Sequence, residues 1–432
     1  MSSIWTKEID RPQFEELKQD IKTDVLIIGG GITGILCGYM LKKEGVDCVL
    51  VEADKICSGI TKNTTAKISC IHGLICDKMI ARYGKDVARL YMEAQTESLE
   101  QYRKLAEIIN CDFETADSFV FTKKNRAKIE KEAAAFEKIG YPAVFSENLS
   151  LPFSIECAVG IKNQAQFHPL KLLFEIAKDI TIYENTKVIE IRPDVIVTSG
   201  GKIKASKIIV ATHFPFLNKH GSYFLKMYQH RSYVMAFENT PKINGMFVDE
   251  NEKGMSLRQY KGALLLGGGS HRTGKNGGGW NEISSFAKRV YPNSVEICRW
   301  ATQDCMTLDD IPYIGMYSKN TPGLYVATGF NKWGMTSAMT AALVLKDVIQ
   351  DKENKYQEVF SPSRSMLHPQ LAINVAEAVA GLVIPKAPRC PHMGCALKYN
   401  HQEHSWDCSC HGSRFDKSGK LINNPANDDL KL

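Results

Sequence analysis

The chain has 432 residues, of which 44% are hydrophobic and 24% charged, and its formal net charge is +6. A chain of this length exceeds one ordinary core, so we expect two or three folded units. The small net charge is not gathered into runs, which argues against a nucleic-acid partner. No apolar stretch of about eighteen residues is present, which argues against a transmembrane segment.

Thirteen cysteines occur in a chain whose residues 1–24 are polar and charged and lack an apolar signal core. In a long chain without such a signal, cysteines indicate reduced thiols and a metal site rather than a disulfide network. We therefore expect a cytoplasmic protein.

The first predicted element is an apolar strand at residues 24–28, which runs directly into the sequence G-x-G-x-x-G. Gly29 allows a tight turn, Gly31 lets the backbone approach a pyrophosphate, and Gly34 allows close packing of helix on strand. Ile32 and Thr33 lie within this glycine turn, before a helical pattern at residues 35–44 whose free N–H groups at its start favour phosphate. A second strand at residues 46–51 ends at Glu52, which can accept hydrogen bonds from a ribose. This order predicts a dinucleotide-binding βαβ unit.

A small, polar loop follows at residues 58–67 and includes Thr61, Thr65 and Ala66. One interpretation is that this loop folds back towards the phosphates of the cofactor. The alternative is an ordinary solvated loop. Amphipathic periodicity then predicts helices at residues 86–109 and 123–139. His168 precedes a proline, and we expect a structural residue there rather than a base.

Several strands are predicted in the middle of the chain. Residues 207–213 form a buried strand that ends in small residues, including Ala211 and Thr212, where a sheet edge can meet a cofactor. Strand-like runs at residues 228–237 and 263–269 suggest a second sheet facing the first. The strand at residues 323–329 opens into a second glycine-rich helix start, which suits negative charge.

Two short arms near the chain end each offer one thiolate and one imidazole: Cys390 with His392, and Cys408 with His411. An iron–sulfur centre with two Cys on one iron and two His on the other needs this ligand set. The alternative is a structural zinc site, but zinc arms favour C-x₂₋₄-C and H-x₃₋₅-H rather than mixed Cys/His arms.

The last 45 residues or so resemble Rieske proteins, in both arms, in residues 412–416 and in residues 419–426. The resemblance implies a [2Fe-2S] cluster held by the four residues above, and a disulfide between Cys395 and Cys410 that clamps the arms. Phe415 stands where respiratory Rieske proteins usually carry a Tyr whose hydroxyl donates to a ligand sulfur. We therefore predict a reduction potential below that of respiratory Rieske centres but above that of plant-type ferredoxins.

Residues 22–352 resemble the D-amino-acid-oxidase-like family of FAD-dependent oxidoreductases. The resemblance rests on the N-terminal glycines with Glu52 and on residues 167–169, 211–212, 309–315 and 327–330. It implies FAD, with the isoalloxazine between the nucleotide domain and the second sheet. The implied contacts are the glycine motif, Glu52 and the following residues: Thr61, Thr65, Ala66, Val188, Ala211, Thr212, Gly329, Phe330, Trp333, Gly334 and Met335. The whole chain is similar to a bacterial fusion of such an oxidoreductase with a short Rieske tail.

The expected fold class is α/β, with a Rossmann-like FAD-binding domain, an α+β substrate domain and a small all-β Rieske subdomain. The oxidoreductase takes residues 1–352. Its nucleotide-binding parts are about 22–80, 160–215 and 300–352, and its substrate domain is about 81–159 and 216–299. A linker at 353–386 precedes the Rieske domain at 387–432.

One departure from the family bears on the substrate. Amino-acid oxidases of this family commonly read W-x-G-x-R-P, with the Arg holding a substrate carboxylate, and here Asp304 occupies the Arg position. A carboxylate would be repelled there and an amine attracted, so a cationic amine is the favoured substrate. Arg231, Arg258 or Arg272 could replace the missing cation.

We therefore predict an enzyme that oxidises a small substrate and passes electrons between flavin and cluster to an unknown one-electron partner. The alternative is a flavin oxidase reoxidised by dioxygen, whose tail is a docking or redox-sensing module. A Rieske oxygenase is disfavoured because no spaced two-His-one-carboxylate set is evident. The general base stays unassigned. Unlinked FAD is the default, although His72 or one of several cysteines could attach it.

Overall fold

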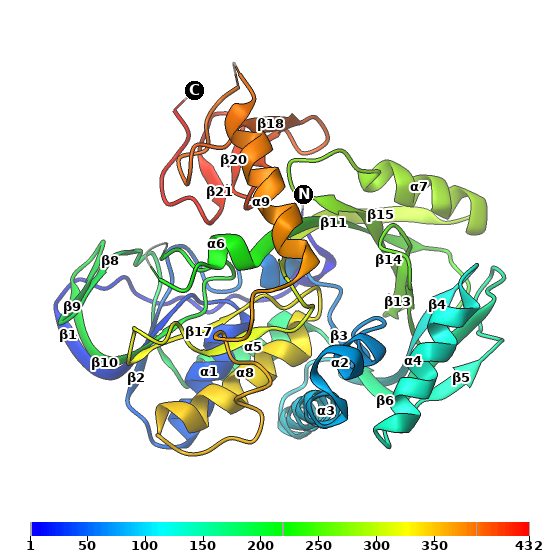
Figure 1. Cartoon of the computed structure of the whole chain (residues 1–432), viewed down its shortest axis with the longest axis horizontal. Coiled ribbons are helices and arrows are strands. Elements are labelled where there is room, and N and C mark those ends of the chain that lie inside the picture. Colours follow the sequence, from blue (N-terminus) through cyan, green and yellow to red (C-terminus); the bar gives the residue numbers. More distant parts are fainter. Residues whose placement is uncertain (1, 218–219, 386, 432) are drawn as a thin grey trace.

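The computed structural model describes residues 2–217, 220–385 and 387–431. Its strands form three sheets (Figure 1). Two large sheets make up the body of the molecule, and a small sheet formed by the C-terminal residues sits on top of them in this view. Among the described residues, no helix is long and apolar enough to cross a membrane.

The first sheet is organised around β1 (Ile21–Ile28), which pairs in parallel with β2 (Cys48–Val51) on one side and β10 (Lys202–Val210) on the other. The sheet is covered on both faces, so successive residues of β1 are buried on opposite sides: Ile27 packs in one core cluster and Leu26 in another. This burial explains the continuous apolar run. In open sheets of parallel strands, ligands bind in the crevice beyond the carboxyl ends of the strands. The crevice lies where the connections from two neighbouring strands run in opposite directions.

The other members of the first sheet extend it on both sides. They are β7 (Thr181–Tyr183), β8 (Val188–Arg192), β9 (Val195–Thr198), β16 (Tyr313–Met316) and β17 (Leu324–Thr328). Three helices pack beside this sheet: α1 (Ile32–Lys43), α5 (Pro169–Ala177) and α8 (Gly334–Ile349). Helix α1 contacts both α5 and α8, and α3 (Lys85–Ile108) lies against α8. His168 accepts a hydrogen bond from the Lys171 amide at the start of α5, so it caps that helix, as expected for a structural residue.

The second sheet runs in the order β15-β11-β14-β13-β12-β4-β6-β3, with β5 paired to β6. These strands are β3 (Lys67–Ile68), β4 (Glu114–Thr122), β5 (Val144–Ser146), β6 (Cys157–Gln166), β11 (Met227–Glu238), β12 (Met246–Asp249), β13 (Ser256–Tyr260), β14 (Ala263–Arg272) and β15 (Val295–Thr307). The helices near it are α2 (Cys76–Tyr83), α4 (Arg126–Lys138) and α7 (Gly279–Val290). Residues 300–307, expected in the nucleotide-binding part, instead belong to this sheet because β15 pairs along its length with β11.

The third sheet joins β18 (Leu397–Asn400), β19 (Ser405–Cys408), β20 (Arg414–Asp416) and β21 (Leu421–Asn423) in sequence order. Its small core consists of the cysteines, Leu397, Phe415 and Leu430 with a few neighbours. Short elements complete the chain: the 3₁₀ turns Ile4–Thr6 and Ile60–Asn63 and the single-turn helix α6 (Tyr223–Lys226).

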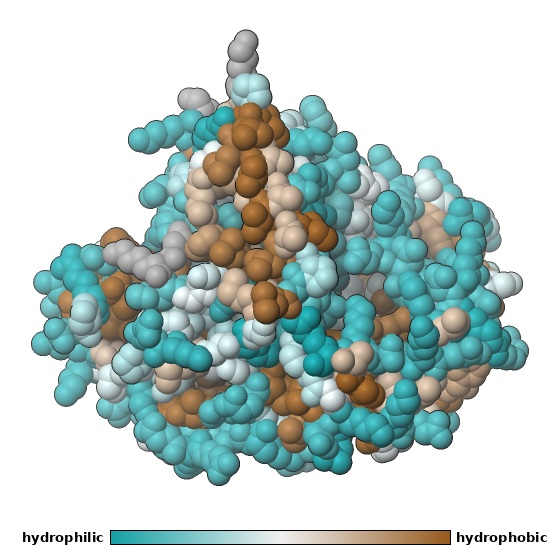
Figure 2. Space-filling model, viewed as in Figure 1, coloured by the Kyte–Doolittle hydropathy of each residue, from teal (hydrophilic) through white to brown (hydrophobic). Residues whose placement is uncertain are grey.

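The segment predicted as a linker does not behave as a free linker over its described residues, 353–385. Phe360 is buried in the main core, and Arg364 forms an ion pair with Asp309. The following helix, α9 (Pro369–Val383), packs on the small sheet. A Cβ at Gly381 would lie 2.6 Å from the Cys410 sulfur, which shows how closely helix and cluster arm approach. The outer face of α9 carries an exposed apolar band (Figure 2).

Candidate functional site

A cavity of about 870 Å³ lies between the carboxyl edge of the first sheet and the facing strands of the second. Most residues predicted to contact FAD line it, and these are Gly29, Gly31, Ile32, Thr33, Glu52, Thr61, Thr65, Val188, Ala211, Thr212, Gly329, Phe330, Trp333, Gly334 and Met335. Gly34 and Ala66 do not line it. Segments distant in sequence therefore meet at one site.

The first glycine motif is shaped by close backbone approaches. Gly29 has φ +111°, and a Cβ there would lie 2.7 Å from the Ala211 carbonyl oxygen. A Cβ at Gly34 would lie 1.9 Å from the Gly29 oxygen, so Gly34 serves helix packing behind the cavity. No side chain caps the start of α1, although the Thr61 hydroxyl accepts from the Ile32 amide at 3.0 Å. An uncapped helix start facing a cavity is suited to phosphate.

Glu52 lies at the end of β2, as predicted, and its carboxylate holds the surrounding loop. It accepts hydrogen bonds from the Gly30 amide at 2.6 Å and the Asp54 amide at 2.9 Å. Burial raises its pKa, and the two amides oppose that shift. Ala66 is the other predicted residue outside the cavity. Its carbonyl oxygen accepts a hydrogen bond from Arg258 at 2.7 Å.

The second helix start, α8, is also uncapped by any side chain. Trp333 precedes it and stacks on the His72 ring at a centroid distance of 5.0 Å. Nδ1 of His72 meets the Tyr91 hydroxyl at 2.6 Å, and Nε2 meets the Ser69 carbonyl and the Thr336 hydroxyl. Burial lowers the His72 pKa to about 3, so the ring is neutral. His72 therefore positions Trp333, and both its nitrogens are already engaged.

The cavity roof is formed by strands of the second sheet. Alternate residues of β15, Thr302, Asp304 and Met306, line it, and His230 lies opposite Asp304 on β11. Burial raises the pKa of the half-buried Asp304 to about 6. The positive charge of Lys332, which also lines the cavity, partly offsets this rise.

Two histidines of the cavity wall carry a buried ring nitrogen that has no hydrogen-bond partner among the described residues: Nδ1 of His230 and Nε2 of His213. Burial lowers the pKa of His230 to about 3 and that of His213 to about 4, so both rings are neutral. Unpaired buried polar atoms in a native site are normally satisfied by a ligand or by water. They therefore favour a polar ligand in this cavity.

None of the three arginines that could replace the missing substrate cation lines the cavity. Arg231 pairs with Glu403, Arg258 donates to the carbonyls of residues 65 and 66, and Arg272 donates to the carbonyls of residues 409 and 410.

Sequence reasoning missed a different buried cation, Lys67, at the start of β3. Its ammonium contacts the Ser256 hydroxyl, and the residue as a whole is 8% exposed. In the described part of the chain no carboxylate lies within ion-pairing distance of it. Burial, with the neighbouring Arg258 charge, lowers its pKa to about 7. The only signal in the sequence was a lysine directly before an apolar residue in a polar loop.

The two predicted cluster arms come together on the third sheet. The Cys390 and Cys408 thiols hydrogen-bond to each other, which lowers the Cys390 pKa. Nδ1 of His392 lies 3.2 Å from Nδ1 of His411. Two sulfurs therefore face one another, as do two imidazole nitrogens, which is the donor arrangement that a Rieske cluster requires.

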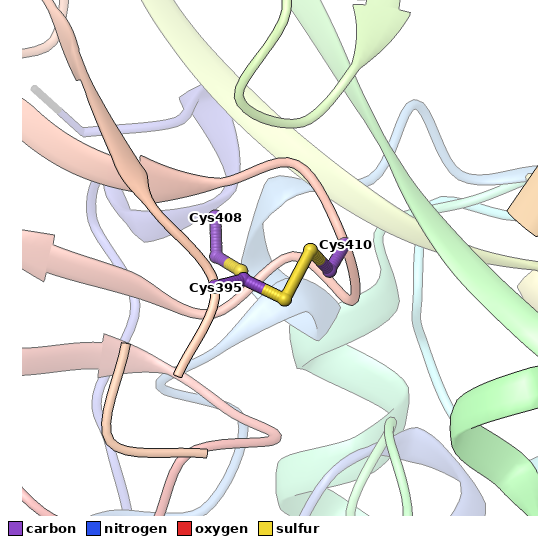
Figure 3. A group of neighbouring side chains, drawn as sticks. All are labelled: Cys395, Cys408 and Cys410. Carbon is purple, nitrogen blue, oxygen red and sulfur yellow. A yellow bond between two sulfur atoms is a disulfide. The ribbon is translucent and has the colours of Figure 1, made fainter. Parts of the chain in front are cut away.

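The predicted disulfide pair is also present: Cys395 and Cys410 are bonded, with their Cα atoms 6.6 Å apart. Figure 3 shows Cys408 beside them, and the three sulfurs lie within 4.8 Å of one another. Because a disulfide offers no thiolate, only Cys408 of these three is available to a metal.

The family model described as FAD dependent oxidoreductase matches residues 24–348. The chain belongs to this family. A second family model, Rieske [2Fe-2S] domain, matches residues 361–432 and so includes α9. The enzyme is therefore an FAD-dependent oxidoreductase with a C-terminal Rieske domain, and its cofactors are FAD and a [2Fe-2S] cluster.

Individual relatives share this organisation in whole or in part. The putative Rieske 2Fe-2S iron-sulfur protein YhfW of Bacillus subtilis is 35% identical over 99% of this chain and 97% of its own length. Gamma-glutamylputrescine oxidoreductase of Escherichia coli is 27% identical over 46% of this chain and 50% of its own. The structure of glycine oxidase from Geobacillus kaustophilus superposes with a TM-score of 0.67 at 19% identity, covering 80% of this chain and 99% of that one, which shows a common fold.

The oxidoreductase and the Rieske domain meet through two buried glutamines. Gln229, on β11, donates from its side-chain amide to the His411 carbonyl at 2.8 Å. Gln303, on β15, donates to the Gly412 carbonyl at 2.8 Å. The neighbours of these glutamines in the chain, His230 and Asp304, line the cavity on the other side of the same two strands. β11 and β15 therefore lie between this cavity and the cluster arms.

Proposed function

We propose that the enzyme oxidises an amine in the cavity and passes the electrons singly through the Rieske cluster to a one-electron partner. The observation that carries this proposal is the shared pair of strands, in which adjacent residues reach the flavin cavity and the cluster loop. When bound, FAD accepts the two electrons of substrate oxidation, and the cluster carries one at a time. A single strand layer between two redox sites supports transfer between them.

The protein's own residues supply binding and orientation. The uncapped starts of α1 and α8 would hold the anionic parts of FAD through their amides and helix dipoles. Cys390, His392, Cys408 and His411 would hold the cluster irons. The neutral rings of His230 and His213 offer hydrogen bonds to bound groups.

Asp304 supports an amine as the substrate. Its carboxylate faces the cavity, where it attracts a substrate ammonium group. The three candidate arginines are engaged outside the cavity, and the charges of Lys332 and Arg231 oppose the effect of burial on the Asp304 pKa. A relative whose name specifies a putrescine derivative, gamma-glutamylputrescine oxidoreductase, supports the same class because putrescine is an amine.

Anaerobic rapid mixing of the loaded enzyme with a panel of amines tests the electron route. We expect flavin absorbance to fall first and oxidised-cluster absorbance to fall afterwards. If the cluster stays oxidised while admitted dioxygen restores the flavin, the Rieske domain is instead a docking or sensing module.

The substrate class is tested by Asp304→Asn. Loss of a charged hydrogen-bond partner costs about 1.5–3 kcal/mol, so we expect kcat/KM for an active amine to fall roughly ten- to hundredfold. Asp86→Asn is the control, because Asp86 is exposed on the surface of α3 and pairs there with Arg89. Unchanged kinetics in Asp304→Asn would contradict the proposed amine contact.

A further inference from the structure

The Rieske domain contributes directly to the wall of the flavin cavity. The contributing residues are Leu421, Ile422, Asn423, Asn424, Ala426 and Asn427. They line the same cavity as Val188 and as Glu52 and Thr212, which follow strands at the carboxyl edge of the first sheet. This wall segment, residues 421–427, thus lines the cavity that most of the predicted FAD contacts line, although it lies outside the oxidoreductase match.

Hydrogen bonds fix the wall segment to the cavity edge. The side-chain amide of Asn424 donates to the Thr212 carbonyl at 2.8 Å and to the Phe214 carbonyl at 2.6 Å. Lys187 donates from Nζ to the Asn427 carbonyl at 2.8 Å. Thr212 and Lys187 themselves line the cavity. The position of the cavity edge therefore depends on the position of the wall segment.

Hydrogen bonds also connect the wall segment to both cluster arms. The Asn424 carbonyl accepts from Gln229 at 2.9 Å, and the same Gln229 amide donates to the His411 carbonyl. The Ala426 amide donates to the Ser413 hydroxyl at 3.0 Å, and that hydroxyl hydrogen-bonds to Cys390. One arm thus reaches the segment through His411 and the other through Cys390.

We propose that the wall segment is part of the FAD-binding site and that cluster assembly and FAD binding favour each other. The cluster holds the two arms together, the arms hold the segment, and the segment completes the cavity. Coupling between two binding sites is reciprocal, so an assembled cluster strengthens FAD binding and bound FAD slows cluster loss. This coupling holds whichever way electrons flow between the two cofactors.

The coupling is tested on the full-length protein. Iron is removed anaerobically with a chelator, and the FAD dissociation constant is measured by flavin fluorescence before removal, after removal and after reconstitution. We expect FAD to bind about tenfold more weakly to the stripped protein and to recover on reconstitution. An unchanged dissociation constant overturns the coupling.

The wall itself is tested with Asn424→Asp, which keeps the side-chain size but replaces the two donated hydrogen bonds with repulsion between carboxylate and carbonyls. Lys417→Ala is the control, because Lys417 is exposed in the turn between β20 and β21. Both variants are compared at full cluster occupancy, established by electron paramagnetic resonance. About tenfold weaker FAD binding in Asn424→Asp alone supports the proposal, and equal affinity in all three proteins overturns the role of Asn424.

Discussion

The side-chain amide of Gln303 donates to the side-chain oxygen of Gln229 at 2.6 Å, and the pair is fully buried between the oxidoreductase and the Rieske domain. The Gln303 amide also donates to the Gly412 carbonyl, and the Gln229 amide donates to the carbonyls of His411 and Asn424. A buried glutamine at this position would be costly without such partners. The pair therefore acts as a polar junction that orients the Rieske domain on β11 and β15.

Replacing Gln303 with leucine is expected to loosen this junction. The change leaves the Gly412 carbonyl and the Gln229 oxygen without their donor, which costs about 1–3 kcal/mol for a buried group. Thermal unfolding of the loaded protein measures the loss. Gln19→Leu is the control, since Gln19 is exposed and its side chain makes no hydrogen bond in the described part of the chain. Equal midpoints for the two variants would show that the junction contributes little.

Glu403 provides a second, ionic junction. It pairs with Arg231 of β11 and, at 3.0 Å, with Arg414 of the Rieske domain. Burial opposes its ionisation, but the two guanidinium groups outweigh burial and lower its pKa to about 2. Removing one partner of a buried pair costs about 3–5 kcal/mol, so we expect Glu403→Gln to be strongly destabilising at pH 7.

The pH dependence of the Glu403 effect has a definite sign. The folded protein keeps Glu403 ionised at pH values where the unfolded chain already binds a proton, so its contribution is complete above about pH 4.5 and declines towards pH 2. The gap in unfolding free energy between wild type and Glu403→Gln should therefore narrow as the pH is lowered from 6 to 3. Glu130→Gln, in an exposed pair with Arg126, should cost less than about 1 kcal/mol throughout.

Much of the fold was predictable because local patterns determine it. Residues 86–109 were predicted as a helix and α3 spans Lys85–Ile108, since its apolar stripe has a clear helical period. The cluster arms were equally predictable, because their chemistry lies within short spacings. The roles of Gln229, His230 and Lys67 were not, because they depend on which face of a strand meets the cavity. That face is set by pairing between strands distant in sequence, such as β11 with β15.

Replacing Lys67 with methionine is expected to stabilise the protein at low pH. The Lys67 pKa is about 7 in the folded state and near 10.5 in the unfolded chain, so the unfolded state binds more protons between these values and wild-type stability rises with pH there. Below about pH 7 the wild type bears the full cost of a buried charge. Lys67→Met should therefore gain on the order of 2–4 kcal/mol over wild type at pH 6 and less at pH 9.

Thermal unfolding at the two pH values checks the Lys67 prediction. Lys417→Met serves as the control because Lys417 is exposed, and it should shift the midpoint little at either pH. A Lys67→Met midpoint below that of wild type at pH 6 would mean that the ammonium makes a stabilising contact stronger than its desolvation cost.

The potential of the cluster depends on hydrogen bonds to the ligand sulfurs, because such bonds stabilise the reduced, more negative cluster. The Ser413 hydroxyl hydrogen-bonds to Cys390, whereas Phe415, fully buried in the core of the Rieske domain, has no hydroxyl to donate. We expect Ser413→Ala to lower the reduction potential and Phe415→Tyr to raise it. Wild type should lie below respiratory Rieske centres and above the value of about −400 mV that is typical of plant-type ferredoxins.

Potentiometric titration followed by circular dichroism measures these potentials. Tyr399→Phe is the control: it removes a hydroxyl from β18 that makes no hydrogen bond in the described part of the chain, so its potential should equal that of wild type. A wild-type potential as high as the respiratory class would show that Phe415 does not limit it. The amides that face Cys390 and Cys408 would then provide the missing stabilisation, because the backbone of residues 392, 393, 410 and 411 hydrogen-bonds to the two sulfurs.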